Sequence, residues 1–347
     1  MLVTDDIQTL RAWRRDADRP VGLVPTMGAL HAGHLSLVAA ARSRCPTVVV
    51  SVFVNPLQFG PGEDFDSYPR DVPGDLDKLR AAGIDAVFAP QAEQFVGDLA
   101  TTVTVAGVTT GFEGASRPGH FAGVATIVSK LFNVVGPDVA CFGEKDFQQL
   151  VTIRRMVADL DVPVEVVGLP IVRDDDGLAL SSRNVRLSAD DRLTALRLSA
   201  SLRAADAAWG GDADRARAAL WRTLRDGDGI DVDYADVVDE ATLVPLTGAG
   251  HTAARALVAA RVGGTRLIDN LLLALRKERE LRPSAEAGRA TRNGPGKGSS
   301  AKERELRPSA EAGRATRNGP GKGSSRRDSG GGGETSDDVR SPGQEIG

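Results

Sequence analysis

Short runs of β-branched residues alternate with helical patterns along the first half of the chain. The run from Thr47 to Asn55 contains five valines, which is typical of a strand buried on both faces. The predicted strands are Val21–Pro25, Thr47–Asn55, Asp85–Ala89, Asp138–Phe142 and Val162–Val172. The predicted helices are His34–Ser43, Asp75–Ala82, Phe121–Val135 and Phe147–Leu160. Strands that alternate with helices predict a parallel sheet covered on both faces, a Rossmann-like α/β fold.

The pattern changes after Val172. A loop over 173–188 precedes two long helical stretches at 189–209 and 213–225. Three candidate strands follow, at Asp233–Val238, Ala256–Val262 and Arg266–Asn270. Helices followed by neighbouring strands are typical of an α+β domain. We therefore predict a Rossmann-like catalytic domain over residues 1–172 and a smaller α+β domain over residues 173–276.

Residues 277–347 fit neither domain. The segment Lys277–Ser300 recurs letter for letter at Lys302–Ser325, an offset of 25 residues. Only 11 of these 71 residues are Ala, Val, Ile or Leu, and none is aromatic. Such a segment cannot bury enough apolar surface to offset the entropy lost on ordering. We predict a disordered tail without a catalytic role, and a basic tail that binds polyanions is the alternative.

Charge and composition argue against a nucleic-acid-binding, a membrane-spanning and a secreted protein. The net charge is −4, divided into +4 for residues 277–347 and −8 for residues 1–276. An acidic body argues against nucleic acid as the partner, because phosphate contacts need a basic face. The longest apolar run, residues 48–54, is too short to cross a bilayer, and the start of the chain does not read as a signal peptide. We expect a cytoplasmic protein that does not bind a membrane, with Cys45 and Cys141 as buried thiols.

The strongest chemical signal is the segment 25–34, which leaves a predicted strand, turns through glycines and enters a helix. His31 and His34 are three residues apart at the start of that helix, so both can face one ligand. Gly33 lets a ligand approach the backbone, and the free N–H groups of a helix N-terminus suit phosphate. Imidazoles can donate hydrogen bonds to a phosphorus centre, and they ordinarily titrate near neutrality. The alternative is a capping histidine followed by a core histidine.

Two further segments carry candidate phosphate ligands. Lys145, between a predicted strand and a helix, can neutralise phosphate charge, and Asp146 can either bond a ribose or cap the next helix. Ser181, Ser182 and Arg183 lie in the loop after Val172, where hydroxyls and a guanidinium can cradle phosphates. An ordinary polar turn is the alternative for that loop. Gln58 and Gln149 follow buried segments, where an amide needs partners.

These residues carry a family resemblance. The HxGH motif after a first strand resembles the nucleotidyltransferase superfamily, and the string LVPTMGALHAGHLSLV resembles the pantothenate synthetases (pantoate–β-alanine ligases) in particular. The strings that follow in order are VSVFVNPLQFGPGEDFDSYPRD, RPGHFAGVATIV, FGEKDFQQL, DGLALSSRNVRLS and GGTRLIDN. The resemblance spans residues 20–275. It implies an ATP-dependent ligase that condenses pantoate with β-alanine through a pantoyl-adenylate and releases AMP and pyrophosphate.

The resemblance also implies roles for individual residues. It makes His34, His31, Lys145 and Arg183 catalytic, with His34 as proton donor and His31 on the ATP phosphates. The residues implied to bind ATP are Met27, Gly28, Ala29, Leu30, His31, Ala32, Gly33, His34, Gly143, Glu144, Lys145, Asp146, Val172, Leu180, Ser181, Ser182 and Arg183. The residues implied to bind pantoate or β-alanine are Gln58, Gln149, Asn55 and Met27. Arg117 and His120 match the family strings without an assigned role.

Magnesium is expected to accompany the triphosphate with few protein ligands of its own, so we name no metal-binding residue. The resemblance also implies a homodimer. Two other hypotheses compete with the ligase. A different nucleotidyltransferase would share HxGH and the phosphate loop without requiring β-alanine. A binding protein would instead use its basic tail to engage nucleic acid, and its retention on DNA would depend on salt.

Overall fold

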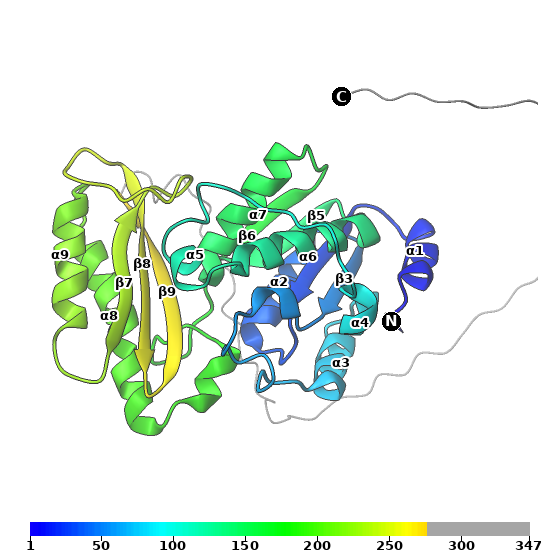
Figure 1. The fold of residues 1–347 in the computed structure, drawn as a ribbon, viewed down its shortest axis with the longest axis horizontal. Helices are drawn as coiled ribbons and strands as arrows, with labels where there is room; N and C mark the ends of the chain where they lie inside the picture. Colours follow the sequence, from blue (N-terminus) through cyan, green and yellow to red (C-terminus); the bar gives the residue numbers. More distant parts are fainter. Residues whose placement is uncertain (276–347) are drawn as a thin grey trace, which may run out of the picture. The chain divides into compact units, whose positions relative to one another are not determined.

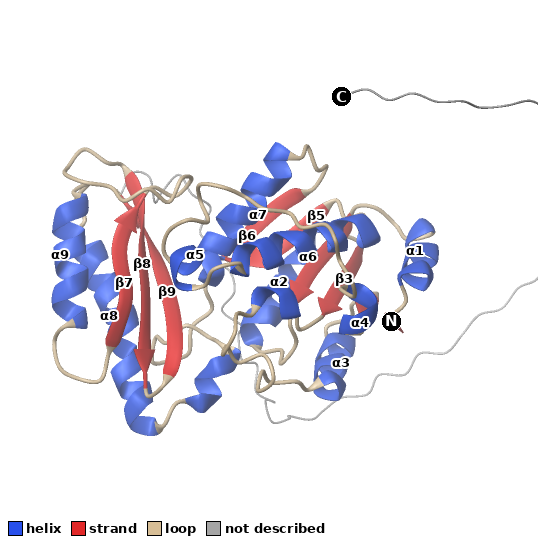
Figure 2. Cartoon of the chain, in the orientation of Figure 1, coloured by secondary structure: helices blue, strands red, loops and turns tan. Residues whose placement is uncertain are grey.

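The computed structural model describes residues 1–275, and these form two sheets (Figures 1 and 2). Six parallel strands lie in the order β1-β4-β3-β2-β5-β6. Their bounds are Leu2–Thr4 (β1), Val21–Thr26 (β2), Thr47–Val52 (β3), Ala86–Phe88 (β4), Val139–Gly143 (β5) and Glu165–Leu169 (β6). The second sheet has three antiparallel strands, which are Asp231–Val238 (β7), Ala253–Val262 (β8) and Thr265–Ala274 (β9). This arrangement confirms the predicted α/β class with a smaller second sheet.

Helices connect the parallel strands. The α-helices of this part are Ile7–Arg15 (α1), Ala32–Arg44 (α2), Val72–Ala81 (α3), Ala92–Phe95 (α4), Glu113–Ser116 (α5), His120–Val135 (α6) and Phe147–Asp159 (α7). Three short 3₁₀ turns are Pro56–Gln58 (η1), Glu144–Asp146 (η2) and Ser182–Arg186 (η3). Ala189–Ala208 (α8) and Ala213–Leu224 (α9) follow before β7. Figure 1 shows both of these helices against the three-stranded sheet.

The parallel sheet is buried on both faces, as its valine-rich strands require. Leu23 of β2 faces one core, which α1, α6 and α7 cover, and Val24 faces the other, which α2 and α3 cover. Neighbouring positions of a strand point to opposite faces, so a continuous apolar run supplies both cores at once. Cys45 and Cys141 are buried free thiols, as expected.

The order of the strands determines where a ligand can bind. From β2 the chain proceeds to β3 and β4 on one side, and β5 and β6 pair on the other. The strands β2 and β5 are therefore the point at which the direction of winding reverses. In parallel sheets, the loops beyond the carboxyl ends of two such strands separate and leave a crevice. The HxGH loop follows β2 and the Lys145 turn follows β5, so both segments lie at this crevice.

The three-stranded sheet has its own core. Alanines and valines on one face of β8, such as Ala256 and Val258, pack against apolar residues of α8 and α9. On the opposite face of this sheet, Leu257 of β8 and Val238 of β7 pack into the core of the parallel sheet. The second sheet is thus in direct contact with the first. The expected domain boundary at Val172 stays a prediction.

The structure also differs from the sequence-based expectations in detail. The strand β1 and the helix α1 were not predicted; β1 has three residues, too few for a periodic pattern. The strand predicted over Val162–Val172 covers only Glu165–Leu169, because Pro163 and Pro170 flank it and have no N–H for a ladder bond. The helix predicted from Asp75 begins at Val72, after an Asp71 cap. The predicted tail, 277–347, lies outside the described residues.

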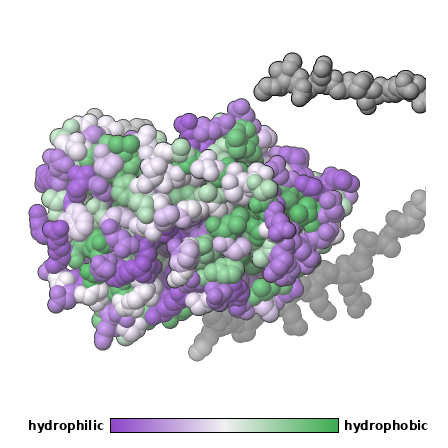
Figure 3. Space-filling model, viewed as in Figure 1, coloured by the Kyte–Doolittle hydropathy of each residue, from purple (hydrophilic) through white to green (hydrophobic). Residues whose placement is uncertain are grey.

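The surface mixes polar and apolar residues. Figure 3 shows hydrophilic and hydrophobic side chains interspersed over the face that it draws. The large apolar side chains that are exposed within residues 1–275 are Met1, Val3, Leu57, Val72, Leu160, Val185, Leu193 and Val244. In the part of the chain that the structure describes, no helix is long and apolar enough to span a bilayer.

Candidate active site

A buried carboxylate shapes the loop between β2 and α2. Asp75, which is 1% exposed, accepts hydrogen bonds from the backbone N–H groups of Ala29 and Leu30, each at 2.7 Å. Gly28 and Ala29 have φ values of 83° and 50°, which turn the chain sharply at the end of the strand. These two bonds join α3 to the loop directly before His31, so Asp75 fixes the position of the His31 backbone.

Both motif histidines cap α2 through the same ring atom. The His31 Nδ1 accepts the Gly33 N–H at 3.1 Å, and the His34 Nδ1 accepts the His31 N–H at 3.4 Å. A nitrogen that accepts a backbone N–H carries no proton in the neutral ring, so each Nε2 carries one. Capping and ligand binding therefore use different atoms. The capping part of the alternative is confirmed, but His34 lines a cavity and is not a core residue. Within residues 1–275, nothing hydrogen-bonds the Nε2 of either ring.

The two histidines are neutral at physiological pH. Burial lowers the pKa of His34 to about 3, and the neighbouring His31 adds to the shift. Burial, followed by the charge of Lys145, also lowers the pKa of His31. The ring centroids are 4.1 Å apart, so two imidazolium ions would repel each other strongly. The expectation of titration near neutrality is therefore wrong for His34, and the pKa of His31 is shifted in the same direction.

Gly33 is required by the packing of the His31 ring. A Cβ at residue 33 would lie 2.9 Å from the His31 Cε1 and 3.0 Å from its Nδ1. Carbon atoms that are not bonded to each other do not approach this closely, so any larger residue would displace the imidazole. The glycine in HxGH thus allows the ring to fold back over its own helix terminus.

One cavity brings the predicted catalytic residues together. It has a volume of about 220 Å³, and His31, His34, Lys145 and Arg183 all line it. His31 caps α2 and His34 lies in its first turn, Lys145 comes from the turn after β5, and Arg183 comes from η3. These segments are far apart in the sequence and meet at the crevice between β2 and β5. The arrangement concentrates two neutral donors and two cations on one small volume.

The turn η2 presents Lys145 and Asp146 to the cavity. The Lys145 ammonium lies 4.0 Å from the Asp146 carboxylate, and its side chain is 21% exposed. Within the described chain, the Asp146 side chain makes no capping bond to α7, so the capping alternative for this residue is wrong. Glu144 points elsewhere, because its carboxylate lies 3.3 Å from Arg255 of β8.

Asp64 holds the loop that carries Arg183. Arg183 forms two parallel bonds to Asp64, at 3.0 and 2.9 Å, and Arg186 bonds the same carboxylate at 2.9 Å. Two guanidinium groups share one carboxylate, so the cluster keeps a net positive charge. The Ser182 hydroxyl lies 3.3 Å from the Tyr68 hydroxyl, and the Arg183 guanidinium lies over the Tyr68 ring.

The amide side chains line the opposite part of the cavity. Asn55, which is 1% exposed, donates to the Gln58 Oε1 at 3.0 Å, and the Gln58 amide nitrogen lies 2.9 Å from the Met27 sulfur. Gln149 faces the same cavity from α7, and no other described residue hydrogen-bonds its amide. By contrast, its neighbour Gln148 is buried and bonded to three backbone groups. The two glutamines that the sequence singled out thus line the same cavity.

Arg117 and His120 hold the backbone around Gln58. The His120 Nδ1 donates to the Gln58 carbonyl at 2.8 Å, and Arg117 donates to the same carbonyl at 3.1 Å. Arg117 also forms two bonds to Glu63, at 2.8 and 2.6 Å. Burial, followed by the Arg117 charge, lowers the pKa of His120 and keeps it neutral. Sequence reasoning left both residues without a role; the structure shows that they position Gln58.

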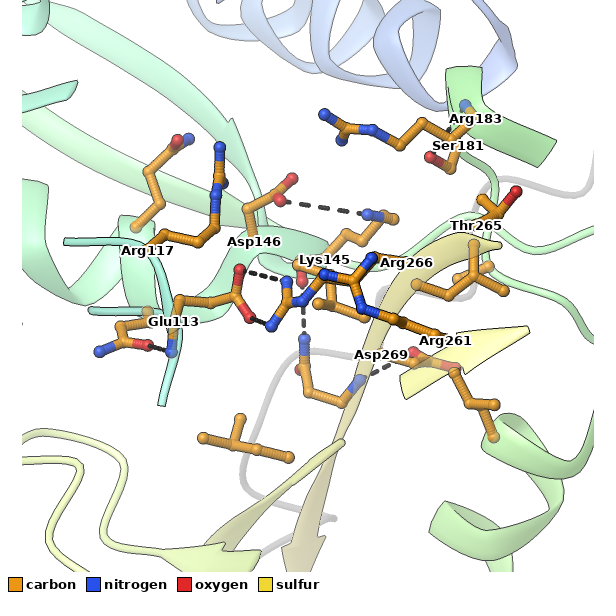
Figure 4. A pocket seen from close by; sticks show the side chains of 18 of the residues that line it. Glu113, Arg117, Lys145, Asp146, Ser181, Arg183, Arg261, Thr265, Arg266 and Asp269 are labelled. Carbon is orange, nitrogen blue, oxygen red and sulfur yellow. Dashed lines mark hydrogen bonds and ion pairs between the residues drawn. The ribbon is translucent and has the colours of Figure 1, made fainter. Parts of the chain in front are cut away.

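A second cavity of about 310 Å³ adjoins the first (Figure 4). The residues that line both are Arg117, His120, Lys145, Asp146, Gln149, Ser181 and Arg183. Figure 4 shows Lys145 and Asp146 on one side of it, Ser181 and Arg183 on another, and Arg266 and Asp269 from the second sheet. Arg266 bonds Glu113 of α5 at 2.6 and 2.8 Å. The second sheet therefore forms a wall of the site.

Most of the residues predicted to bind substrates line the first cavity. Those that do are Met27, His31, Gly33, His34, Asn55, Gln58, Gly143, Lys145, Asp146, Gln149, Val172, Leu180, Ser181, Ser182 and Arg183. Gly28, Ala29, Leu30, Ala32 and Glu144 are not among its described lining residues. Sequence reasoning missed Asp64, Tyr68 and Asp75. The first two lie inside the quoted string VSVFVNPLQFGPGEDFDSYPRD, which was the available signal.

Comparison with known proteins identifies the family. The family model described as pantoate–β-alanine ligase matches residues 2–272. The chain is 54% identical over 270 residues to the pantothenate synthetase of Rhizorhabdus wittichii, covering 77% of this chain and 95% of the relative. It is 49% identical over 281 residues to that of Geobacter sulfurreducens, covering 79% and 99%.

The chain belongs to the pantoate–β-alanine ligase family.

Solved structures agree. The pantothenate synthetase of Thermus thermophilus matches with a TM-score of 0.75 and 50% identity, covering 79% of this chain and all of that one. The pantoate–β-alanine ligase of Francisella tularensis, solved with a β,γ-ATP compound and β-alanine, matches with a TM-score of 0.66 and 32% identity, covering 78% and 97%. The chain is accordingly a ligase that joins pantoate to β-alanine, forming an amide bond with ATP as a substrate. The other nucleotidyltransferases and the nucleic-acid-binding protein are thereby set aside as the main function.

Proposed function

We propose that the cavity beyond β2 and β5 binds ATP and pantoate side by side, and that its residues promote attack of the pantoate carboxylate on the α-phosphorus. The observation that carries this proposal is the common cavity of His31, His34, Lys145 and Arg183. Each of these groups donates hydrogen bonds or carries positive charge, and none is an activated nucleophile. Such a site stabilises charge that develops on a phosphorus centre rather than forming a bond to the substrate itself.

ATP would lie with its phosphates at the N-terminus of α2. The Nε2–H groups of His31 and His34 are free to donate to phosphate oxygens, because their Nδ1 atoms are engaged in the helix cap. Lys145 and the Arg183 cluster would neutralise the triphosphate from the opposite side. Asp146, whose side chain does not cap α7, is left to accept a ribose hydroxyl. His34 serves as a donor to the α-phosphate without transferring a proton, since its ring is already neutral.

Pantoate would occupy the part of the cavity lined by amides. Gln58 and Gln149 can bond its hydroxyl and carboxylate groups, with Asn55 orienting Gln58 and Met27 closing the side. Apolar residues of α6, including Val124 and Ile127, line the same cavity and suit the two methyl groups of pantoate. The carboxylate is then held next to the α-phosphate, which supplies the positioning that such transfers need.

The reaction has two steps that balance in atoms and charge. A pantoate carboxylate oxygen forms a bond to the α-phosphorus, and the bond from that phosphorus to the pyrophosphate oxygen breaks. The uncharged amine of β-alanine next attacks the acyl carbon, which forms the amide bond and breaks the bond between that carbon and the adenylate oxygen. AMP leaves with the oxygen that pantoate supplied, and the amine releases its proton.

Magnesium is proposed to enter with the triphosphate. Among the described residues, no group of three or more His, Cys, Asp or Glu is arranged to hold a metal ion, and Asp146 is the one carboxylate that lines the first cavity. Mg²⁺ commonly keeps water and phosphate oxygens as most of its ligands. The donor set thus suits an ion carried by ATP, which would add positive charge on the phosphates beside Lys145.

The test is pantoate-dependent exchange of labelled pyrophosphate into ATP without β-alanine. The wild-type ligase is expected to catalyse the exchange, and His34→Ala to lower its rate by roughly 10²–10³-fold, the usual effect of removing one such donor. His251→Ala removes an imidazole that lies outside both cavities, so it is the matched control and should exchange normally. Wild-type exchange by a folded His34→Ala variant would refute the assignment.

Location and assembly complete the proposal. We place the ligase in the cytoplasm as a homodimer, in line with the family resemblance. Light scattering on the purified full-length chain gives its mass directly. A mass near twice the 36.4 kDa of one chain supports the dimer, and a mass equal to one chain contradicts it.

A further inference from the structure

Two consecutive residues of the second sheet contact both sides of the ATP site. We infer that Asp269 and Asn270 of β9 are positioning residues. They hold two segments at a fixed separation across the cavity: the Lys145 turn and the loop of Ser181, Ser182 and Arg183, here called the phosphate loop. Successive side chains of a strand point to opposite faces, so one dipeptide can reach two separate segments. Asp269 is 3% exposed at its side chain, and Asn270 is 2% exposed overall. The inference rests on the proposed function, because it explains how the groups named there are held.

Asn270 holds the turn that carries Lys145. Its side-chain nitrogen donates to two successive carbonyls, that of Glu144 at 2.8 Å and that of Lys145 at 3.0 Å. Both amide hydrogens are thereby used on one turn of backbone. A 3₁₀ turn of three residues has little internal bonding of its own. The position of the Lys145 ammonium therefore depends on a residue of a different sheet.

Arg255 fixes the orientation of the Asn270 amide. Its guanidinium donates to the Asn270 Oδ1 at 3.1 Å and lies 3.3 Å from the Glu144 carboxylate. It also lies over the Phe147 ring, 3.9 Å from the centroid, where α7 begins. Because Arg255 can only donate, the Asn270 oxygen faces it and the Asn270 nitrogen must face the turn.

Asp269 holds the other side of the site through Arg173. The two side chains form a pair of parallel bonds, at 2.7 and 2.9 Å. Arg173 begins a hairpin closed by the Leu180 N–H on the Val172 carbonyl at 3.0 Å. That hairpin leads directly into Ser181, Ser182 and Arg183. A bidentate ion pair with a nearly buried carboxylate sets direction as well as distance, so it fixes where the phosphate loop starts.

The test for Asn270 uses the isosteric change Asn270→Asp. The carboxylate keeps the volume and can still pair with Arg255, but it cannot donate to the two carbonyls. We expect the KM for ATP to rise and kcat to fall, each about tenfold or more, because small displacements of a positioned group have large effects. The KM for pantoate should change by about twofold or less, since Gln58 is held by Arg117 and His120 on the opposite wall. Asn270→Ser gives the same test if the aspartate variant does not fold.

Two comparisons distinguish a positioning role for Asn270 from a purely structural one. Leu273→Ala removes a buried side chain from the same strand, away from the turn, so it should lower the melting temperature without altering kcat or either KM. In a Lys145→Ala background, Asn270→Asp should have little further effect on ATP affinity, because the group that it positions is absent. Full additivity of the two changes, or a wild-type KM and kcat in Asn270→Asp, overturns the inference. A Lys145→Ala enzyme with normal exchange would instead contradict the proposed function.

The Asp269 side is tested by a second cycle. Asp269→Asn and Arg173→Gln should each raise the KM for ATP about fivefold to tenfold, and the double variant should be no worse than either single one. The same variants should leave the KM for pantoate near its wild-type value. If the two effects multiply, or if pantoate binding weakens as much as ATP binding, Asp269 does not act through the phosphate loop.

Discussion

At the scale of single residues, the HxGH motif uses its histidines twice. Each imidazole caps α2 with Nδ1 and carries its proton on Nε2, so local folding fixes the tautomer on which the proposed chemistry depends. Burial keeps the rings neutral, and the cap bonds set the direction of their hydrogen bonds. A sequence pattern can show that two histidines face one ligand, but it cannot show how far burial moves their pKa values.

The neutral His34 predicts a specific pH dependence of stability. Its pKa in the folded state is about 3, whereas an unfolded histidine titrates near 6.5. Between these values the unfolded chain binds the extra proton, so this contribution is complete above pH 6.5 and declines as the pH falls. The expected slope from this group is about 1.4 kcal/mol per pH unit. Urea unfolding of His34→Gln between pH 6.5 and 5 should show a shallower decline than the wild type, and equal slopes would contradict the burial argument.

Gly33 gives a steric prediction. A methyl group at residue 33 would lie within 3.0 Å of the His31 ring, so Gly33→Ala should displace that imidazole. We expect kcat to fall by roughly 10- to 100-fold. Stability should change little, because the gain of up to about 1 kcal/mol from replacing a helical glycine is offset by loss of the His31 cap, which costs about 1 kcal/mol. Steady-state kinetics and thermal melts measure the two effects. Gly111→Ala, where an added Cβ has nothing within 4 Å, is the control, and equal kinetics for the two variants would contradict the prediction.

The residues that sequence reasoning missed share one property. Asp75, Asp64 and Tyr68 act on partners far away in the chain, such as the Ala29 N–H or the Arg183 guanidinium. Nothing in the local pattern around Asp75 distinguishes it from a solvated helix residue. Motif residues could be found because their neighbours in sequence define their setting. Supporting residues are defined by the tertiary structure, so the sequence around them does not indicate their roles.

At the scale of elements, the switch between β2 and β5 creates the cavity, and α6 lines the part of it that we propose binds pantoate. Gly123 of α6 packs so tightly on η1 that an added Cβ would lie 2.1 Å from the Leu57 carbonyl oxygen. The Asn55 side chain also donates to the Gly123 carbonyl at 3.2 Å. The helix and the Asn55–Gln58 segment are therefore fixed to each other by direct contact of their backbones.

That contact predicts a split between the two substrates. Gly123→Ala should push η1 away from α6, raise the KM for pantoate about tenfold and change the KM for ATP much less. It should also lower the free energy of unfolding by roughly 1–3 kcal/mol, the cost of overpacking. Ala122→Gly on the same helix should cost about 1 kcal/mol of stability without any steric intrusion, so it controls for destabilisation. Equal pantoate KM values in the two variants would show that the close packing does not matter for binding.

The elements themselves were largely predictable. Apart from α1, each long helix and buried strand was anticipated, because its apolar pattern or continuous apolar run extends over many residues, as in α6 and β3. The short edge strand β1 and the ends of β6 were not, because three residues carry no period and flanking prolines override propensity. The sequence indicated a second, smaller sheet but could not show that it would contact the Lys145 turn.

At the scale of the whole molecule, the two cavities are lined by residues of both sheets. The last described residue that lines either cavity is Asn270. Both proposed positioning residues and all four proposed catalytic residues precede residue 271, and the family model ends at residue 272. We therefore expect a chain of residues 1–276 to keep kcat and both KM values within about twofold of the full chain. The same assays on the two chains measure this. A large loss of activity would show that the repeated segment takes part in catalysis or folding.

The central claim is that the pantoate carboxylate attacks the α-phosphorus of ATP within this cavity. The most direct measurement is the fate of ¹⁸O from carboxylate-labelled pantoate in a complete reaction with β-alanine. The mechanism predicts one labelled oxygen in each AMP and none in pyrophosphate, because the amide step breaks the bond between the acyl carbon and the adenylate oxygen. Unlabelled AMP, with ¹⁸O in pyrophosphate or orthophosphate instead, would contradict attack at the α-phosphorus.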